Sequence, residues 1–180
     1  MDSAEARTEE ASMERLPQAV RCQCGRPLDG SGSREHSRGK DGKLERSAMV
    51  GLDTSVVLRL LVGEPEEQAQ VAQTFLDELF EAGEKAAVSD LVVSEVYFAL
   101  QFHYRVPKSE ALASLKAMFE SGEVVSLGHA ASILETRGLA SAKPGFVDRL
   151  IHAEYEANAD AMATFEKKAA RLASTRILRC

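Results

Sequence analysis

The sequence of 180 residues contains no apolar run near the roughly 20 residues that a membrane-spanning helix needs. Its first residues also lack an apolar stretch of secretory type, so we expect no signal peptide and a cytoplasmic location. A hydrophobic content of 44% with 28% charged residues is typical of a soluble globular protein. The length allows one good core, and two full domains would be crowded.

Cysteine is also scarce. The three cysteines are Cys22, Cys24 and Cys180, an odd number with the first two too close for an easy disulfide. We therefore expect no disulfide framework, which agrees with a reducing compartment. Cys22 and Cys24 with His36 could form half of a zinc site, but no second Cys/His pair follows at ligand spacing, so zinc is disfavoured.

An excess of positive charge is absent as well, because the formal net charge is -6. Residues 1–48 are balanced, residues 49–136 hold 14 acidic and 5 basic residues, and residues 137–180 hold 8 basic and 5 acidic residues. Nucleic-acid binders are usually basic overall, so any such contact here must be local and metal-assisted. The basic C-terminal quarter is the better candidate for touching phosphate.

Residues 1–48 differ in amino-acid composition from the rest of the chain. They are rich in Gly, Ser, Arg and Glu and poor in large apolar residues, which predicts disorder. Two interpretations remain open: a flexible tail, or an N-terminal extension that results from placing the translation start too early. We favour the second, because Met49 stands immediately before the first strand-like run. The folded domain is then expected at residues 49–180.

From Met49 onward, strand-like and helix-like patterns alternate. Strands are predicted at 49–53, 86–90, 123–127 and 160–165, with a possible last strand at 175–178. Helices are predicted at 54–63, 64–83, 90–104, 108–122, 129–138, 145–157 and 166–174. This alternation predicts an α/β fold in which helices flank a central, mostly parallel sheet.

Four acids occupy comparable places in that fold. Asp53 closes the first predicted strand, and Glu166 follows the fourth. Glu95 and Asp148 each lie about one turn into a helix. Ligands of such sheets bind beyond the carboxyl ends of the strands, so we expect the four carboxylates to converge on one rim.

Converging carboxylates repel one another, and a hard divalent cation relieves that repulsion. Mg²⁺ takes one or two carboxylates directly and keeps several waters. Such waters suit phosphoryl chemistry, because one becomes a stronger nucleophile while the metal stabilises charge on the phosphate. The pattern therefore predicts metal-dependent hydrolysis of a phosphodiester without a His, Cys or Ser triad.

Each acid also has a structural interpretation. A buried, unpaired carboxylate at Asp53 would be costly, which favours function there, and a helix cap is expected from Thr54 or Ser55 instead. Asp148 could form an ion pair with a basic side chain, and Glu166 could interact favourably with the dipole at the start of a helix. Asp90 is expected to be a cap.

Weaker candidates surround the acids. Those expected to contact substrate or a metal-bound water are Thr54, Thr164, Arg149 and Lys167, with capping or solvated charge as the alternative. His152 lies one turn after Asp148 and is expected to be a surface or interface histidine. The helix that carries Tyr97, Phe98, Phe102 and Tyr104 is expected to be mostly core, with part of it available to a partner.

Four segments together resemble one known family. They are residues 49–55 around Asp53, 89–96 around Glu95, 145–151 around Asp148, and 163–168 around Glu166. In this order, over about 130 residues, they resemble a PIN domain of the VapC toxin type.

The resemblance implies a PIN-like three-layer fold and an endoribonuclease that depends on Mg²⁺ or Mn²⁺. It implies a toxin of a toxin-antitoxin pair, usually dimeric and held inactive by a cognate antitoxin protein, with tRNA, rRNA or mRNA as substrate. By position, Asp53, Glu95 and Asp148 take the metal-binding roles. The fourth acid is usually Asp but is Glu166 here, and Gly145 stands near a place where many members carry a further acid.

Rival functions fit less well. The run Asp53-Thr54-Ser55 is similar to an aspartic-protease turn, but it leads into a helix and has Ser in place of Gly. An aspartyl phosphatase usually needs a second Asp two positions after the first, where Ser55 stands. The remaining alternative is a non-catalytic PIN-like module that binds RNA or protein through a weakened site.

Overall fold

The computed structural model describes residues 48–179, so the expectations for the N-terminal segment, the zinc half-site and Cys180 lie outside the described residues. Three short parallel strands form the central sheet: β1 (Met49–Gly51), β2 (Lys85–Val88) and β3 (Val124–Ser126), in the order β1-β2-β3. Val50 lies opposite Ala86, and Ala86 lies opposite Val124. All three strands therefore end at the same rim.

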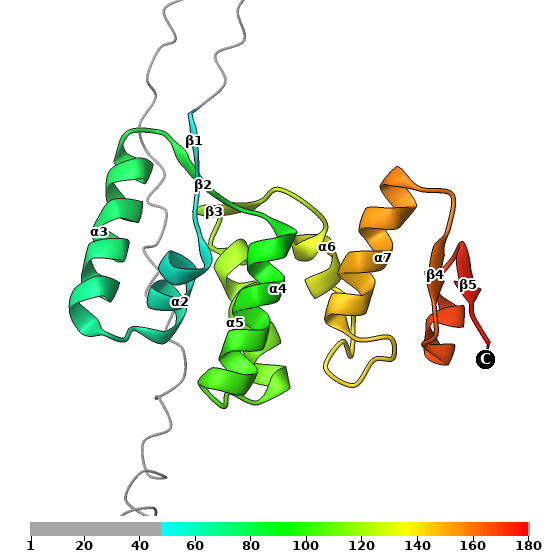
Figure 1. Ribbon diagram of the computed structural model, residues 1–180. Helices are drawn as coiled ribbons and strands as arrows, with labels where there is room; N and C mark the ends of the chain where they lie inside the picture. Colours follow the sequence, from blue (N-terminus) through cyan, green and yellow to red (C-terminus); the bar gives the residue numbers. More distant parts are fainter. Residues whose placement is uncertain (1–47, 180) are drawn as a thin grey trace, which may run out of the picture.

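Helices connect and cover these strands (Figure 1). They are α2 (Thr54–Val62), α3 (Glu66–Glu81), α4 (Asp90–Phe98) with its π-helical continuation η1 (Ala99–His103), α5 (Lys108–Glu120) and α6 (Ala130–Leu134). The α/β class predicted from the sequence is confirmed. Gly63, which follows α2, has a φ of 78°, a left-handed conformation that glycine adopts without a Cβ penalty and that ends the helix.

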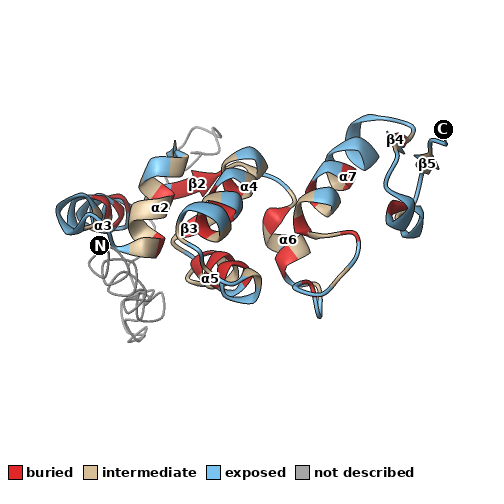
Figure 2. Ribbon diagram, turned by 60° about the horizontal axis from the view of Figure 1, so that its bottom comes forward, coloured by how far each residue is buried: buried red, intermediate tan, exposed pale blue. Residues whose placement is uncertain are grey.

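The core lies between the sheet and the inner faces of the helices (Figure 2). Val57 of α2, Val88 of β2 and Leu115 of α5 are fully buried.

The apolar residues of α3 predict a face of Val71, Phe75 and Leu79 with Leu76 and Phe80 beside it. The inner face in the structure differs in part. Ala72, Leu76 and Leu79 are buried there, whereas Val71 is 71% exposed. Leu76 and Leu79 are buried as predicted, but Phe75 and Phe80 are exposed with Val71, because the closely spaced apolar residues of this helix supply two adjacent stripes.

A second unit follows at the C-terminal end of the described chain. It consists of α7 (Phe146–Asn158), β4 (Met162–Thr164), the 3₁₀ helix η2 (Lys167–Arg171) and β5 (Thr175–Ile177). β4 and β5 form a separate two-stranded parallel sheet, with Ala163 opposite Arg176. Figure 1 shows α7 standing between this sheet and the rest of the molecule. The five strands are thus divided between two sheets.

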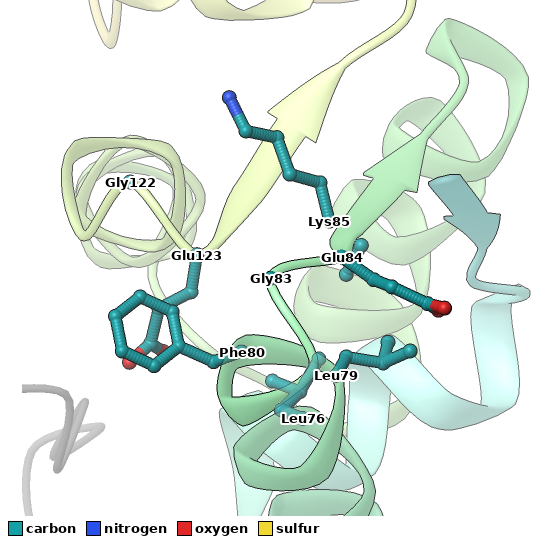
Figure 3. Close-up of a pocket in the computed structure, with 9 residues that line it drawn as sticks. Leu76, Leu79, Phe80, Gly83, Glu84, Lys85, Gly122 and Glu123 are labelled. Carbon is teal, nitrogen blue, oxygen red and sulfur yellow. The ribbon is translucent and has the colours of Figure 1, made fainter. Parts of the chain in front are cut away.

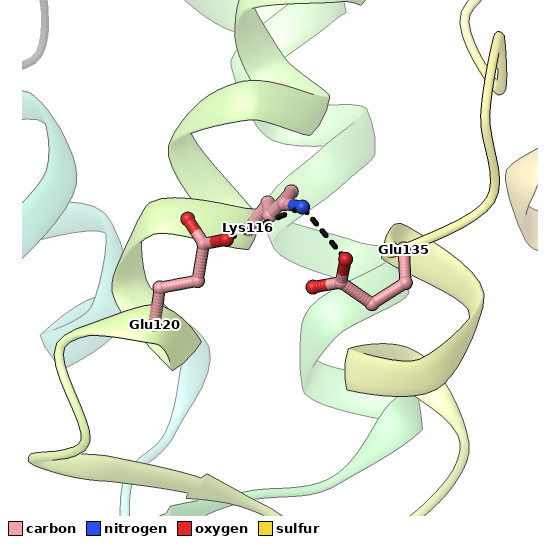
Figure 4. Close-up of polar contacts among 3 residues, drawn as sticks. All are labelled: Lys116, Glu120 and Glu135. Carbon is pink, nitrogen blue, oxygen red and sulfur yellow. Dashed lines mark hydrogen bonds and ion pairs between the residues drawn. The ribbon is translucent and has the colours of Figure 1, made fainter.

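An ion-pair cluster fixes the chain before it leaves for α7 (Figure 4). Lys116 of α5 contacts Glu135 at 2.7 Å and Glu120 at 3.2 Å. The hydrogen bond that Lys116 donates to Glu135, followed by the one it donates to Glu120, raises the pKa of Lys116. Because Glu135 directly follows α6, this cluster holds the start of the α6–α7 connection against α5.

A small pocket lies at the end of the sheet opposite the rim (Figure 3). The residues that line it come from the end of α3, the start of β2 and the turn before β3, including Phe80, Lys85 and Glu123. None of the four acids lines this pocket. None of the described helices is long and apolar enough to cross a membrane.

Asp90 connects two elements across the rim. Its two carboxylate oxygens accept the backbone N–H groups of His129 at 2.7 Å and Ala130 at 2.9 Å, where α6 begins. The expectation that Asp90 caps its own helix is wrong, since Ser89 caps α4. Asp90 instead accepts the first N–H groups of α6. A side chain at Gly128 would collide with this carboxylate, whose Oδ1 lies 2.7 Å from the position of a Cβ.

We expect Asp90→Ala to lower the free energy of unfolding by about 1–3 kcal/mol, because two N–H groups of α6 lose their acceptor. Gly128→Ala should also destabilise the protein by displacing the carboxylate. Urea unfolding followed by circular dichroism measures both. The matched control is Asp77→Ala, which removes an exposed acid from α3. Equal stability of Asp90→Ala and the control would contradict this role.

Candidate functional site

Asp53 lies just beyond the end of β1 and forms the N-cap of α2. Its Oδ1 accepts hydrogen bonds from the Val56 N–H at 3.0 Å and the Ser55 hydroxyl at 2.8 Å. Two expectations are therefore wrong: Asp53 is exposed rather than buried, and the cap is Asp53 rather than Thr54 or Ser55. The apolar run of the strand does not bury its last residue, because α2 turns away at that point.

These hydrogen bonds also set the charge of Asp53. The Val56 N–H, followed by the Ser55 hydroxyl, lowers the pKa of this carboxyl below its usual value. The carboxylate is accordingly ionised at neutral pH and available as a hard oxygen donor. The contribution of Ser55 was missed from the sequence, although a hydroxyl two residues after an acid is a known local pattern.

Glu95 lies close to this position. It is exposed on α4, and the Thr54 hydroxyl donates a 2.6 Å hydrogen bond to its Oε2. Thr54 follows Asp53 directly, so the two acids are joined through one intervening side chain. We name Asp53 and Glu95, with Thr54 between them, the rim pair.

Asp148 lies in the first turn of α7, where its Oδ2 accepts the Gly145 N–H at 2.9 Å. Its expected pairing with a base is not seen at Arg149, which instead donates to the Pro144 carbonyl at 3.2 Å. Burial raises the pKa of Tyr97, and the charge of Asp148 adds to that rise. Phe146, the first residue of α7, packs on Tyr97, so the first turn of α7 with Asp148 lies on the Tyr97 side of α4. Glu95 precedes Tyr97 by two residues on α4 and therefore points to the opposite side of that helix.

Glu166 caps η2, and its Oε1 accepts the Lys168 N–H at 3.2 Å. The Thr164 hydroxyl accepts the Glu166 N–H at 3.0 Å. The helix-start interpretation of Glu166 thus has a structural basis, and Thr164 stabilises the same turn. Both residues belong to the C-terminal unit with Asp148, whereas the rim pair belongs to the N-terminal part.

The four acids consequently do not meet in one chain. Among residues 48–179, no group of three or more Asp, Glu, His or Cys side chains lies close enough to hold a metal ion. The expected convergence of the four carboxylates on a single rim is not seen among the described residues, where β4 does not join the central sheet. The rim pair supplies two hard donors, which fits Mg²⁺ with its retained waters. The other two acids, Asp148 and Glu166, belong to the C-terminal unit instead.

Of the remaining candidate site residues, some make structural contacts and others lie on the surface. Arg149 is half-buried and holds the turn before α7, whereas Lys167 is exposed. His152 is 8% exposed, and its Nε2 lies 2.7 Å from the Ala173 carbonyl oxygen. It is therefore not the expected surface or interface histidine but a link between α7 and the segment before β5.

The aromatic side chains of α4 and η1 are likewise partly buried and partly exposed. Tyr97 is buried against Phe146, with ring centroids 5.2 Å apart. Phe98 and Phe102 are exposed and stack on each other, with centroids 6.0 Å apart. They lie on the same face of the helix as Glu95.

A parallel α/β domain with acids beyond the strand ends defines a class of site that suits divalent-cation chemistry on phosphate esters. The sequence pattern of the PIN domain family matches residues 50–174, which include all four acids. The chain therefore belongs to the PIN domain family. Neither the comparison with curated proteins nor the comparison with solved structures gives a match.

The lowered pKa of Asp53 predicts a pH-dependent stability. A carboxyl whose folded pKa is depressed stabilises the fold above its unfolded value of 3.8 and loses this contribution as pH falls through the folded value. We expect the wild type to exceed Asp53→Asn in urea midpoint at neutral pH, and the difference to shrink below pH 3.8. Asp77→Asn is the control. A difference that stays constant across this range would refute the linkage.

Proposed function

We propose that this protein is a metal-dependent endoribonuclease that hydrolyses phosphodiester bonds of RNA. The observation that carries the proposal is the rim pair, exposed beyond the strand ends of a PIN domain. PIN domains are generally nucleases, and a nuclease needs accessible carboxylates rather than buried ones. Exposure of Asp53 and Glu95 meets that need.

Each member of the rim pair has a task that its contacts suit. Asp53 is held by hydrogen bonds at Oδ1 only, so the rest of its carboxylate is directed away from the α2 cap. Thr54 fixes the Glu95 carboxylate from Oε2. This fixing reduces the rotamer freedom that a flexible glutamate would lose on binding a ligand.

A bound Mg²⁺ or Mn²⁺ supplies charge stabilisation on the phosphate and a more acidic water. Asp53 and Glu95 would hold it, with Asp148 and Glu166 as the further acids of the site. The substrate phosphates require cations, and the exposed Lys167 beside Glu166 offers one. Thr54 and Thr164 orient carboxylate-bearing segments rather than touching RNA directly.

The biological setting is proposed on the same basis. A VapC-type toxin would be cytoplasmic, act as a homodimer and be silenced by a cognate antitoxin protein. The exposed Phe98 and Phe102 beside Glu95 suit a protein partner that covers the site. The second candidate is a non-catalytic module that binds RNA or protein, which the separation of the four acids favours.

Asp53→Asn should abolish cleavage of total RNA in the presence of Mg²⁺ or Mn²⁺ while leaving the fold intact. Asparagine keeps the shape and can still cap α2, but it removes the charge. Cleavage is followed on denaturing gels, folding by circular dichroism, and metal binding by calorimetry with Mn²⁺. The matched control is Asp77→Asn, which should cleave like the wild type.

A fully active Asp53→Asn variant would reject the carboxylate mechanism. Absence of Mn²⁺ binding by the wild type at millimolar concentration, together with retained RNA binding, would favour the non-catalytic module.

Glu166→Asp should retain activity, because it keeps both the carboxylate and an N-cap side chain while shortening the arm by one methylene. Initial rates of RNA cleavage by this variant and by Glu166→Gln provide the test. We expect Glu166→Gln to lose more activity than Glu166→Asp. A loss in Glu166→Asp as large as that in Asp53→Asn would show that the length of this side chain is essential.

A further inference from the structure

The pocket at the end of the sheet opposite the rim contains a polar group that the fold leaves unsatisfied. We name it the Glu123 pocket, and the residues that line it include Leu76, Leu79, Phe80, Lys85 and Glu123. The Oε2 atom of Glu123 is buried and has no hydrogen-bond partner among residues 48–179. No other buried side-chain oxygen or nitrogen in that part of the chain is left in this state. Buried polar atoms are nearly always hydrogen-bonded, because an unpaired one costs free energy.

The backbone on both sides of Glu123 fixes its position. Gly122, in the turn after α5, has a φ of 78°, and the Ser121 hydroxyl oxygen accepts the Glu123 N–H at 3.3 Å. Val124, which follows, is buried at the start of β3. The turn between α5 and β3 therefore presents the Glu123 side chain at the pocket from a fixed backbone.

No cation of the described chain neutralises this carboxylate. The ion pairs formed among residues 48–179 are made by Lys116 and His152, and none includes Glu123. Lys85 lines the same pocket, but it is exposed, and Figure 3 shows its side chain extending away from Glu123. A partly buried carboxylate without a counter-charge favours a cation that comes from outside the chain.

The other walls of the Glu123 pocket are mainly apolar. Leu76 and Leu79 are buried on the inner face of α3, whereas Phe80, the next residue of the helix, is 65% exposed. Figure 3 shows the Phe80 ring and the Glu123 side chain on the same side of the pocket. An exposed aromatic ring beside a carboxylate offers a π face to a bound cation.

The size and the donor set of the pocket restrict the ligand. Its volume of about 150 Å³ is below the roughly 300–1,000 Å³ of pockets for drug-sized molecules, so the bound group must be small. A single carboxylate among apolar side chains does not suit Mg²⁺ or Ca²⁺, which prefer several oxygen ligands. A guanidinium suits it better, because this planar cation donates two parallel hydrogen bonds to a carboxylate and stacks on aromatic rings.

We propose that the Glu123 pocket binds the guanidinium group of a small ligand. Glu123 accepts its N–H groups, and Phe80 stacks on its plane. Leu76 and Leu79 enclose the short alkyl chain that carries it. The ligand class is an alkylguanidine, either free or as the arginine side chain of a peptide. This site lies opposite the rim pair, and its existence does not depend on the proposed nuclease activity.

Calorimetric titration of the full chain with n-butylguanidinium chloride tests the proposal. Glu123→Gln should weaken binding by roughly tenfold or more, because hydrogen bonds to a neutral amide oxygen are weaker than those to a carboxylate. The matched control is Glu81→Gln, which makes the same change at an exposed residue outside the pocket and should bind like the wild type. Equal affinities of Glu123→Gln and this control would overturn the proposal.

The shape of the cation is tested with n-butylammonium, which has no planar donor pair. It should bind more weakly than n-butylguanidinium, and Phe80→Leu should reduce this preference, because leucine keeps an apolar wall without a π face. A preference for n-butylammonium in the wild type would contradict a guanidinium site.

The source of the guanidinium is decided by comparison with N-acetylarginine amide, in which the same group is carried on a peptide unit. Tighter binding of this compound would support an arginine side chain as the ligand, whereas tighter binding of n-butylguanidinium would support a free alkylguanidine. Absence of binding by both compounds at millimolar concentration would overturn the proposal.

Stability gives a second, independent measurement. Glu123→Met should raise the urea midpoint while abolishing binding, because apolar atoms of similar volume replace an unpaired buried oxygen. Glu81→Met is the control and should unfold close to the wild-type midpoint. A lower midpoint for Glu123→Met than for this control would show that the carboxylate stabilises the fold itself, and would reject its assignment as a ligand-binding group.

Discussion

Helices that start directly after a strand expose backbone N–H groups that need acceptors, and in this protein carboxylates supply them. Asp53 serves α2, Asp90 serves α6, Asp148 serves the first turn of α7, and Glu166 serves η2. Asp53 also lies at the rim where phosphate chemistry is proposed. An acid there is consequently both a structural acceptor and a possible ligand, and removing its charge separates the two roles better than removing the side chain.

The sequence was sufficient for the order and type of the elements. Alternating patterns located β1 at Met49, β4 near Met162 and the last strand near Thr175. The helices predicted at 108–122 and 145–157 begin within one residue of α5 and α7. These elements follow from local periodicity and turn chemistry. The sequence could not decide the inner face of α3, because Val71, Ala72, Phe75 and Leu76 supply two adjacent apolar stripes.

The candidate site was predictable in part. Asp53 and Glu95 lie near each other because β1 and β2 are neighbours, as a parallel sheet requires. The separation of Glu166 from them depends on where β4 pairs, which is a long-range property without a local signal. The burial of His152 was also missed, because its contact with the Ala173 carbonyl spans 21 residues.

The shortness of β1 and β4, three residues each, limits what either edge can hold. An edge of that length forms only a few backbone hydrogen bonds, each with a net contribution of about 1 kcal/mol. Most of the stability of the rim must then come from the buried side chains of the helices that pack on the sheet, such as Val57 of α2 and Val93 of α4.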